Sequence, residues 1–321
     1  MILETCASKV GLTKVALDKK NNSVLHEALD AYPGEIRWNE PIAPYTSFKV
    51  GGPAEAMVFP KTTLEVSFLM NQISSHKLPW FILGGGSNLL VRDGGIEGVV
   101  LQLKHLQQIR EKDDGIIFAE AGVSFPKLST TAKEKGFSGL EFAVGIPGTV
   151  GGAVVMNAGI PNEETEAVLK ELTLVDDAGE IKTYVRARVP FGYRSAHLPK
   201  GVVISASFQL EAAPVEQIEE KMKRLLKRRR ETQPLSFPSV GSVFKNPEKG
   251  YAGKIIEACG LKGSCLGGAQ ISKRHGNFII NQGAARAEDV LGLIRMTQKR
   301  VQEMEGIILE PEVRVVGVEA S

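Results

Sequence analysis

Cysteine is scarce in this chain of 321 residues. Its three cysteines, Cys6, Cys259 and Cys265, are odd in number, and no histidine or cysteine lies near them at the spacing of a metal-binding finger. We therefore expect a reducing compartment and no metal site, with Cys259 and Cys265 in a packed turn.

Long apolar runs and a dominant charge are also missing. Residues 1–20 lack the apolar core of a signal peptide, and no later stretch approaches the length of a membrane span. The net charge of +2 gives no broad field for nucleic acid. The basic run 221–230 follows three glutamates on the same helix, which favours a solvated face. We expect a cytoplasmic protein with no membrane insertion and no nucleic-acid partner.

Hydrophobic periodicity predicts the alternation of strands and helices that is typical of an α+β protein. Residues 38–44 are expected to be irregular, and a strand over 54–59 follows them. The strands 169–175 and 181–185 are expected to form a hairpin whose turn is 177–179. Helical spacing places Leu64 on the buried face of a helix that begins near Thr62, and Met304 on the buried face of a helix over 287–304. A final strand is expected over 307–318, where Pro311 favours an edge or a strand start.

Glycine, in contrast, is abundant, with 34 residues. Gly84, Gly85 and Gly86 follow a short apolar run and precede Ser87 and Asn88. Without Cβ atoms such a loop can turn sharply, and its successive N–H groups can form a nest for an anion. The loop matches neither a P-loop nor the Gly-x-Gly-x-x-Gly of a Rossmann turn. A glycine-rich surface turn is an equal alternative.

A second glycine-rich segment covers residues 145–159. Its many small residues leave room for a large flat or extended ligand along the backbone. Together the two segments suit the pyrophosphate and the ring of a dinucleotide, whereas a glycine-rich hairpin with close strand packing is the alternative.

Three polar motifs follow downstream. Arg194, after Phe191-Gly192-Tyr193, could stabilise a carboxylate or an enolate through charge-assisted hydrogen bonds. Ser242 lies in a constrained loop and could donate a proton to a carbanion. Glu310 and Glu312 place carboxylates near the C-terminus. Taken alone, these motifs read more readily as a surface arginine, a capped turn and paired surface acids.

In order along the chain, the segments 45–52, 83–90 and 145–159 and the three downstream motifs resemble the UDP-N-acetylenolpyruvoylglucosamine reductase (MurB) family. The resemblance runs from residue 38 to residue 316. It implies a two-part FAD-binding domain of the vanillyl-alcohol-oxidase (PCMH) type plus a C-terminal α+β substrate-binding domain. The implied limits are an N-terminal extension (1–34), a first FAD subdomain (35–105, with strand 311–321), a second FAD subdomain (106–213) and a substrate domain (214–310).

The resemblance implies NADPH-dependent reduction of UDP-N-acetylglucosamine enolpyruvate to UDP-N-acetylmuramate through FAD, a cytoplasmic step of peptidoglycan precursor synthesis. The flavin is expected to be non-covalent, because residues 84–88 include no His or Cys. A different FAD-dependent oxidoreductase on the same scaffold is the alternative, and a monomer is the default expectation. The implied flavin contacts are Tyr45, Thr46, Val50, Gly51, Leu83, Gly84, Gly85, Gly86, Ser87, Asn88, Leu89, Gly145, Pro147, Gly148, Thr149, Gly151, Gly152, Ala153, Asn157, Ala158 and Gly159.

The implied catalytic residues are Arg194, the proton donor Ser242, and Glu312, which is selected over Glu310 because the family's glutamate directly precedes a valine. The implied substrate contacts are Tyr193, Asn246, Gln270, His275 and Asn281. Residues 233–238 have neither the lysine nor the room for the tyrosine loop of some members, so the chain resembles the shorter type. The candidates for binding the UDP diphosphate are Arg228, Arg229 and Arg230.

Overall fold

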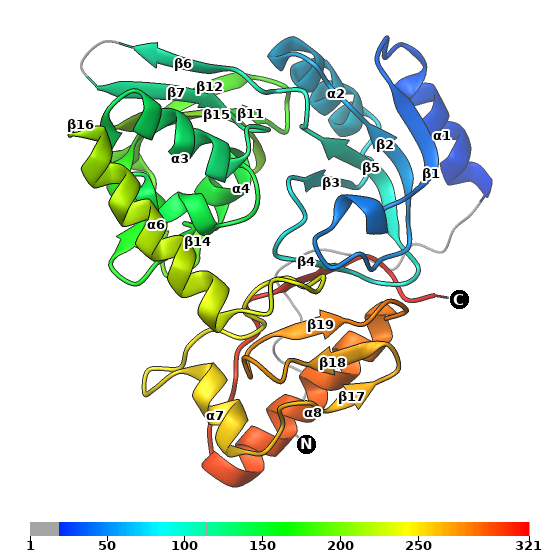
Figure 1. Cartoon of the computed structure of the whole chain (residues 1–321). Coiled ribbons are helices and arrows are strands. Elements are labelled where there is room, and N and C mark those ends of the chain that lie inside the picture. The colour runs from blue at the N-terminus through cyan, green and yellow to red at the C-terminus, as the bar shows by residue number, and fades with distance from the viewer. Residues whose placement is uncertain (1–18, 113–114, 321) are drawn as a thin grey trace.

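The computed structural model describes residues 19–112 and 115–320. Cys6 and most of the expected N-terminal extension lie outside the described residues. The described elements form three groups that meet around a common centre (Figure 1). No helix in this part of the chain has the length and apolar character needed to cross a membrane.

The first group is a four-stranded sheet in the order β1-β2-β5-β3. Strand β1 is antiparallel to β2, whereas β5 runs parallel to both β2 and β3. Helix α2 begins as expected, because the Thr62 side chain accepts a hydrogen bond from the Glu65 N–H. The elements of this group are α1 (Lys19–Asp30), β1 (Ile36–Pro41), η1 (Ala43–Tyr45), β2 (Pro53–Val58), α2 (Thr63–Ser75), β3 (Trp80–Leu83), β4 (Leu89–Val91) and β5 (Ile96–Gln102).

The second group is a five-stranded antiparallel sheet in the order β12-β11-β15-β7-β6. The expected hairpin around residues 177–179 is confirmed as β11 and β12. Val175 and Ile204 of this sheet belong to the same apolar cluster as Val58 and Leu69 of the first group, so the two groups share a core. The elements are β6 (Ile109–Lys112), β7 (Ile116–Glu120), α3 (Phe125–Glu134), β8 (Phe137–Ser138), η2 (Glu141–Gly145), α4 (Val150–Val155), β9 (Gly159–Ile160), β10 (Glu163–Glu164), α5 (Thr165–Val168), β11 (Leu169–Asp176), β12 (Ile181–Val185), η3 (Arg186–Arg188), β13 (Phe191–Gly192), β14 (Ser195–Ala196), β15 (Gly201–Gln209) and β16 (Glu211–Ala212).

The third group packs a small antiparallel sheet against helix α8. Its core also takes in Phe48 and Leu90 from the first group. Cys259 is buried there, but Cys265 is exposed on a strand, so the expectation of a packed turn was wrong for Cys265. The described residues contain no group of three His, Cys, Asp or Glu that could hold a metal ion. The elements are α7 (Ala252–Ala258), β17 (Cys265–Leu266), β18 (Ala269–Ile271), β19 (Ile279–Asn281) and α8 (Ala287–Glu305).

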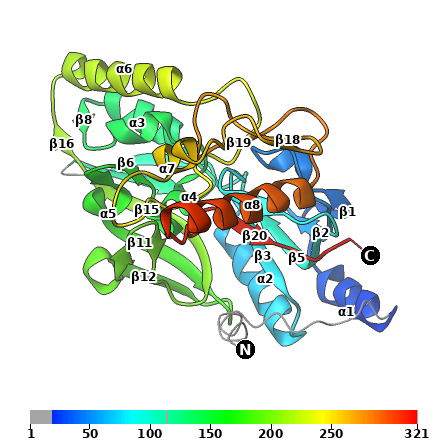
Figure 2. The ribbon, with the colours of Figure 1, turned by 90° about the horizontal axis from the view of Figure 1, so that it is seen from below.

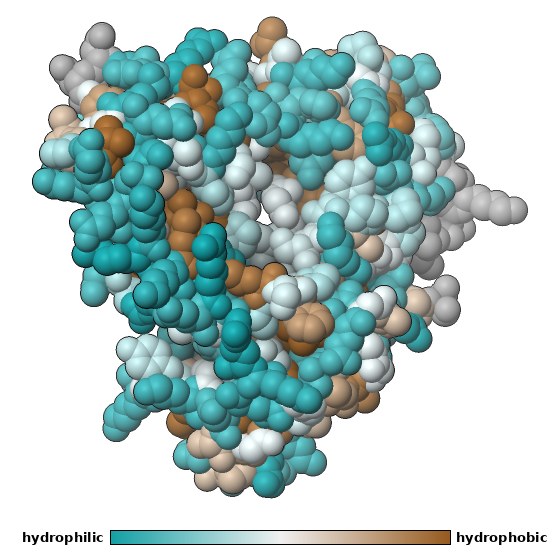
Figure 3. All heavy atoms as spheres, viewed as in Figure 1, coloured by the Kyte–Doolittle hydropathy of each residue, from teal (hydrophilic) through white to brown (hydrophobic). Residues whose placement is uncertain are grey.

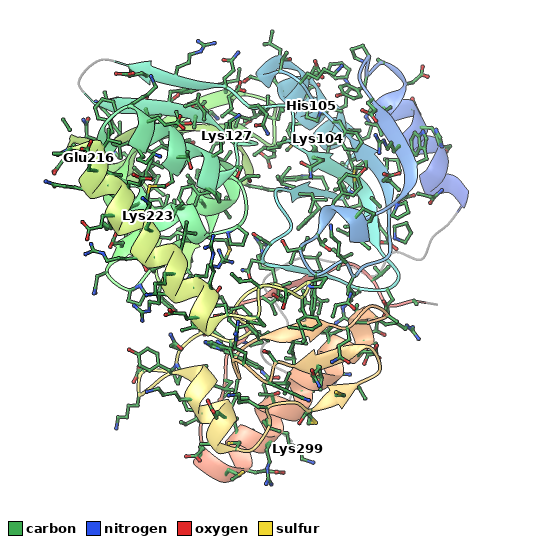
Figure 4. All side chains as sticks on the ribbon, in the orientation of Figure 1. Lys104, His105, Lys127, Glu216, Lys223 and Lys299 are labelled. Atoms are coloured by element: carbon green, nitrogen blue, oxygen red, sulfur yellow. The ribbon has the colours of Figure 1, made fainter. Side chains whose placement is uncertain are left out.

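Helix α6 (Val215–Thr232) packs on the second group, although the sequence assigned it to the third domain. It contacts η2, α3 and β8 and buries Ile218 and Met222, and two views show it alongside α3 (Figures 1 and 2). Most of its charged side chains, including the labelled Glu216 and Lys223, are exposed (Figure 4), whereas Glu219, Lys221 and Arg229 are half-buried. Lys223 pairs with Glu219 one turn earlier. We therefore propose that the third domain begins after this helix, near Gln233.

The C-terminal segment returns to the first group. Strand β20 (Arg314–Val316) pairs in parallel with β4, which continues the loop after β3. The first and third groups are also joined at Asp93, whose carboxylate accepts hydrogen bonds from the Ala287 and Glu288 N–H groups at the start of α8. A side chain of the first group thus caps the longest helix of the third.

Four other local expectations were also wrong. Residues 36–41 form β1 instead of an irregular segment; β1 is an edge strand of mixed polarity, so it carries little hydrophobic pattern. Leu64 and Met304 are 74% and 47% exposed, because the buried stripe of α2 runs through Val66 and Leu69 and that of α8 ends at Val301. The last strand pairs only over 314–316, with an isolated bridge at Pro311.

Candidate active site

One cleft of about 3520 Å³ lies where the three groups meet. Both glycine-rich segments, the Ser242 loop and the C-terminal segment around Glu312 line it. The space-filling view shows this face hollowed at its centre, with apolar side chains visible in the hollow (Figure 3). The volume is several times that of an ordinary small-molecule pocket, so the cleft has room for a cofactor and a second ligand together.

The two glycine loops, defined here as residues 84–88 and 145–152, approach each other through their backbones. A Cβ atom on Gly85 would lie 2.7 Å from Gly148 Cα, and one on Gly148 would lie 2.8 Å from Ser87 Oγ. The Ser87 hydroxyl donates to the Pro147 carbonyl at 2.9 Å. The glycines therefore allow close contact between the loops, in addition to the contact with a ligand that their sequence suggested.

Free donors remain on the first loop. Within the described residues, the N–H groups of Gly85, Gly86 and Ser87 donate to no protein acceptor. Gly86 has a φ of +58°, and its neighbours Gly85 and Ser87 lie on the wall of the cleft. Consecutive free N–H groups in such a turn attract an anion. The loop thus fits the pyrophosphate of a dinucleotide.

Several of the expected flavin contacts lie behind the loops and support them. A Cβ on Gly86 would meet the Tyr45 carbonyl oxygen at 2.4 Å, and the Ser47 N–H donates to the Gly86 carbonyl. Thr46 is buried and donates to two backbone carbonyls. Asn157 is fully buried and hydrogen-bonds to Glu164 and Gly192. Val50 is buried in the core of the third group, and a Cβ on Gly51 would lie 2.7 Å from Val91 Cβ. These five residues therefore shape the site from outside its wall.

Arg194 lies in the turn between β13 and β14, with a positive φ of +55°. One terminal nitrogen, Nη2, donates to the Gly159 carbonyl at 2.8 Å. Its Nε lies 3.3 Å from Glu312 Oε1, and its Nη1 lies 3.6 Å from Glu164 Oε1. We call Arg194, Glu164 and Glu312 the Arg194 cluster. It places a largely buried cation between two carboxylates at the wall of the cleft.

Ser242 and Glu312 come together because their segments pair. Phe244 and Pro311 form an antiparallel bridge, and the Glu312 N–H donates to the Val243 carbonyl at 2.8 Å. Burial raises the pKa of Glu312, and the nearby cations of Arg194 and Lys245 oppose that rise. A carboxyl group with a raised pKa beside an arginine at the wall of a cleft is typical of a catalytic centre.

The expected substrate contacts divide into two sets. Asn246 and His275 line the cleft, and burial lowers the pKa of His275, which favours the neutral ring. Tyr193 is 48% exposed beside Arg194. Gln270 is buried in the third group and donates to the Gly263 carbonyl, and Asn281 donates to the Phe48 carbonyl. The last two join segments of the fold away from the cleft wall.

Arg229 and Glu164 stand out in the structure more than in the sequence. Arg229 lines the cleft, and its side chain lies about 3.3 Å from a Cβ built on Gly145. Burial lowers its pKa, and its Nε donates only to the neutral Gln233 side chain among the described residues. Glu164 follows the second glycine segment, and no local pattern marked it as a partner of Arg194. Only the folding of the β9–β10 hairpin brings it there.

Two family models match the chain. A FAD binding domain matches residues 54–184 and the UDP-N-acetylenolpyruvoylglucosamine reductase, C-terminal domain, matches residues 233–316. The chain therefore combines a FAD-binding domain with a C-terminal α+β domain, as its fold class predicted. FAD is its cofactor, and the free N–H groups of the first loop fit it.

Curated relatives cover nearly the whole chain. The UDP-N-acetylenolpyruvoylglucosamine reductase of Clostridium novyi is 42% identical over 95% of this chain and 98% of its own length. The enzyme of the same name from Bacillus pumilus is 41% identical over 92% of this chain and 98% of its own length. The crystal structure of UDP-N-acetylenolpyruvylglucosamine reductase (MurB) from Thermus caldophilus is 38% identical, covers 88% of this chain and 98% of its own chain, and superposes with a TM-score of 0.75. The chain belongs to the UDP-N-acetylenolpyruvoylglucosamine reductase family.

Proposed function

We propose that this protein reduces UDP-N-acetylglucosamine enolpyruvate to UDP-N-acetylmuramate with NADPH as the co-substrate, a step of peptidoglycan precursor synthesis. The observation that carries the proposal is the meeting of Arg194, Glu312 and the Ser242 loop beside a cleft wall formed by the two glycine loops. FAD, when bound, supplies the hydride for the enol-ether double bond, which no side chain can supply.

The residues of the chain then have distinct roles. Arg194 pairs with the substrate carboxylate and stabilises the negative charge that develops next to it. Glu312 holds the guanidinium at its Nε, whereas Glu164 faces Nη1, and Glu312 also polarises the site. The Ser242 hydroxyl delivers the proton to the carbon that carries this charge. All three groups come from one chain, so the proposed site needs no residue from a second subunit.

Other residues are proposed to hold the ligands. The free N–H groups of Gly85, Gly86 and Ser87 bind the flavin pyrophosphate without a covalent link. Asn246 and His275 contact the substrate from the third group. Arg228 and Arg229, at the end of α6, offer cations for the diphosphate of the sugar nucleotide. Because sugar-nucleotide precursors and NADPH are metabolites of the cytoplasm, we propose that the protein works there.

The test separates the two halves of the reaction in Ser242→Ala. Reduction of the bound flavin by NADPH should be unchanged, whereas reoxidation by the enolpyruvyl nucleotide should slow by about 10²–10⁴-fold, because the proton donor is lost. Stopped-flow absorbance of the flavin measures both rates, and Ser236→Ala in the exposed loop is the control. Equal loss in both halves would exclude Ser242 as the donor. Failure of the nucleotide to reoxidise the reduced wild-type protein would exclude the proposed substrate.

A further inference from the structure

The guanidinium of Arg194 is held from several sides at once. Its backbone has a positive φ, a conformation that residues other than glycine adopt only at an energetic cost. Nη2 donates to the Gly159 carbonyl, and Nε faces Glu312. Nη1 is buried and makes no hydrogen bond within the described residues, and it lies 3.6 Å from Glu164 Oε1.

The Glu164 carboxylate is itself anchored. Its Oε2 accepts a hydrogen bond of 2.8 Å from the Asn157 amide, which is fully buried. The same amide reaches the Gly192 carbonyl, two residues before Arg194, and the Asn157 side-chain oxygen accepts from the Glu166 N–H. Asn157 thus ties Glu164 to the turn that carries Arg194, and this leaves Glu164 Oε1 directed at Nη1.

Backbone pairing also fixes the position of Glu164. Gly159 and Glu164 are paired residues of the β9–β10 hairpin, and a Cβ on Gly159 would lie 2.7 Å from Glu164 Cα. The glycine is therefore required for the crossing that brings its own carbonyl and the Glu164 carboxylate to the same guanidinium. The preceding residue, Glu163, points elsewhere and pairs with Lys221 of α6 at 2.8 Å.

We propose that Glu164 is a positioning residue: together with the Gly159 carbonyl it holds the terminal nitrogens of Arg194, so that the guanidinium stays aimed at Glu312 and the substrate carboxylate. This inference rests on the proposed function. A guanidinium has donors on all three nitrogens, so one part can be held while another part faces the ligand. Glu164 acts on the reaction through Arg194 and not by contact with the reacting atoms.

The arrangement has a consequence for charge. Glu164 and Glu312 share one cation, while Glu312 is also faced by Lys245. In Glu164→Gln the neutral side chain no longer pairs with Arg194, so Glu312 is the only carboxylate of the cluster that faces this cation. The substitution also removes a negative charge near Glu312. Both changes favour the ionised form of Glu312 and so lower its pKa.

The experiment compares Glu164→Gln, Glu164→Asp and the matched control Glu163→Gln. For Glu164→Gln we expect kcat with the enolpyruvyl nucleotide to fall about tenfold, because a misaimed arginine no longer stabilises the charge that develops. The acidic limb of its kcat/KM profile should move to lower pH by about half a unit. Glu164→Asp keeps the charge, so its kcat should fall while its acidic limb stays in place. Glu163→Gln should match the wild type in both.

The outcomes are distinguishable from a structural role and from failure of the proposed function. Flavin absorbance and thermal unfolding are measured for each variant, and the rate of flavin reduction by NADPH should be unchanged in all. A wild-type profile and kcat in Glu164→Gln would overturn the inference, as would an equal shift in Glu163→Gln. If Glu164→Gln lost its flavin, a wild-type kcat in Glu164→Asp would overturn it. Failure of the proposed function would appear earlier, as no turnover of the nucleotide by the wild type.

Discussion

The glycine loops and the Arg194 cluster lie on the same cleft but are held in different ways. The loops contact each other through backbone atoms, and Gly85 and Gly148 touch where no side chain fits. The cluster is held by side-chain charges, with Arg194 between Glu164 and Glu312. One methyl group added to a loop glycine makes the close backbone contact impossible. Removing one charge from the cluster only weakens the electrostatic interactions of the charges that remain. The two regions should therefore respond to substitution very differently.

The largest effect is expected from Gly86→Ala. The added Cβ would lie 2.4 Å from the Tyr45 carbonyl oxygen, and the alanine would have to keep the positive φ of this position. The free energy of unfolding should therefore fall by more than about 2 kcal/mol. The purified variant should carry no flavin, as measured by absorbance after protein concentration is matched. The control is Gly260→Ala, which has a φ of +73° but no atom within 4 Å of its Cβ. It should lose about 1 kcal/mol and keep its flavin. A flavin-loaded Gly86→Ala would contradict the steric account of the loop.

An intermediate effect is expected from Asp93→Ala, at the joint between the first and third groups. The variant leaves the Ala287 and Glu288 N–H groups without their cap, so thermal unfolding should report a loss of about 1 kcal/mol. Asp177→Ala, which removes a solvent-exposed ion pair with Lys200, should change stability by less than about 0.5 kcal/mol. Equal losses in the two variants would show that the joint adds nothing beyond a surface contact.

The smallest effect is expected from Lys245→Met, which removes a cation near the Arg194 cluster and an ion pair with the exposed Glu310. Lys245 opposes the rise in the pKa of Glu312, so its removal should raise that pKa further. If Glu312 acts as a carboxylate, the acidic limb of kcat/KM should move to higher pH by about half a unit. This is opposite in direction to the shift expected for Glu164→Gln. Lys249→Met, at an exposed position nearby, should leave the limb in place. A shift to lower pH in Lys245→Met would contradict the assignment of the limb to Glu312.

Local sequence patterns were sufficient for much of the fold. The hairpin around residues 177–179, the start of α2 after Thr62 and the two glycine loops depend on turn chemistry and hydrophobic spacing within a few residues. Patterns failed where burial depends on a distant partner. Strand β1 has a mixed pattern because it lies at a sheet edge, and Leu64 has a helical spacing but faces solvent.

The candidate site follows the same division. Arg194, Ser242 and Glu312 were named through a family resemblance, because nothing in their local sequences distinguishes them from surface residues. Their grouping needs the bridge between Phe244 and Pro311 and the turn between β13 and β14. Gln270 and Asn281 matched the same resemblance, yet both use their amides to join segments of the fold. Their roles in substrate binding stay predictions.

The sequence by itself determined where the backbone could turn and approach another backbone, because the absence of a Cβ is a property of a single residue. It therefore marked both glycine loops and, with them, the place of a dinucleotide. Only the tertiary structure decided which charges face each other. Arg194 meets Glu164 and Glu312 across 30 and 118 residues of chain, as their numbers in the sequence show, and such contacts depend on how the sheets and hairpins pack. The sequence shows which residues carry a charge, but the packing of the fold determines which oppositely charged residue each one meets.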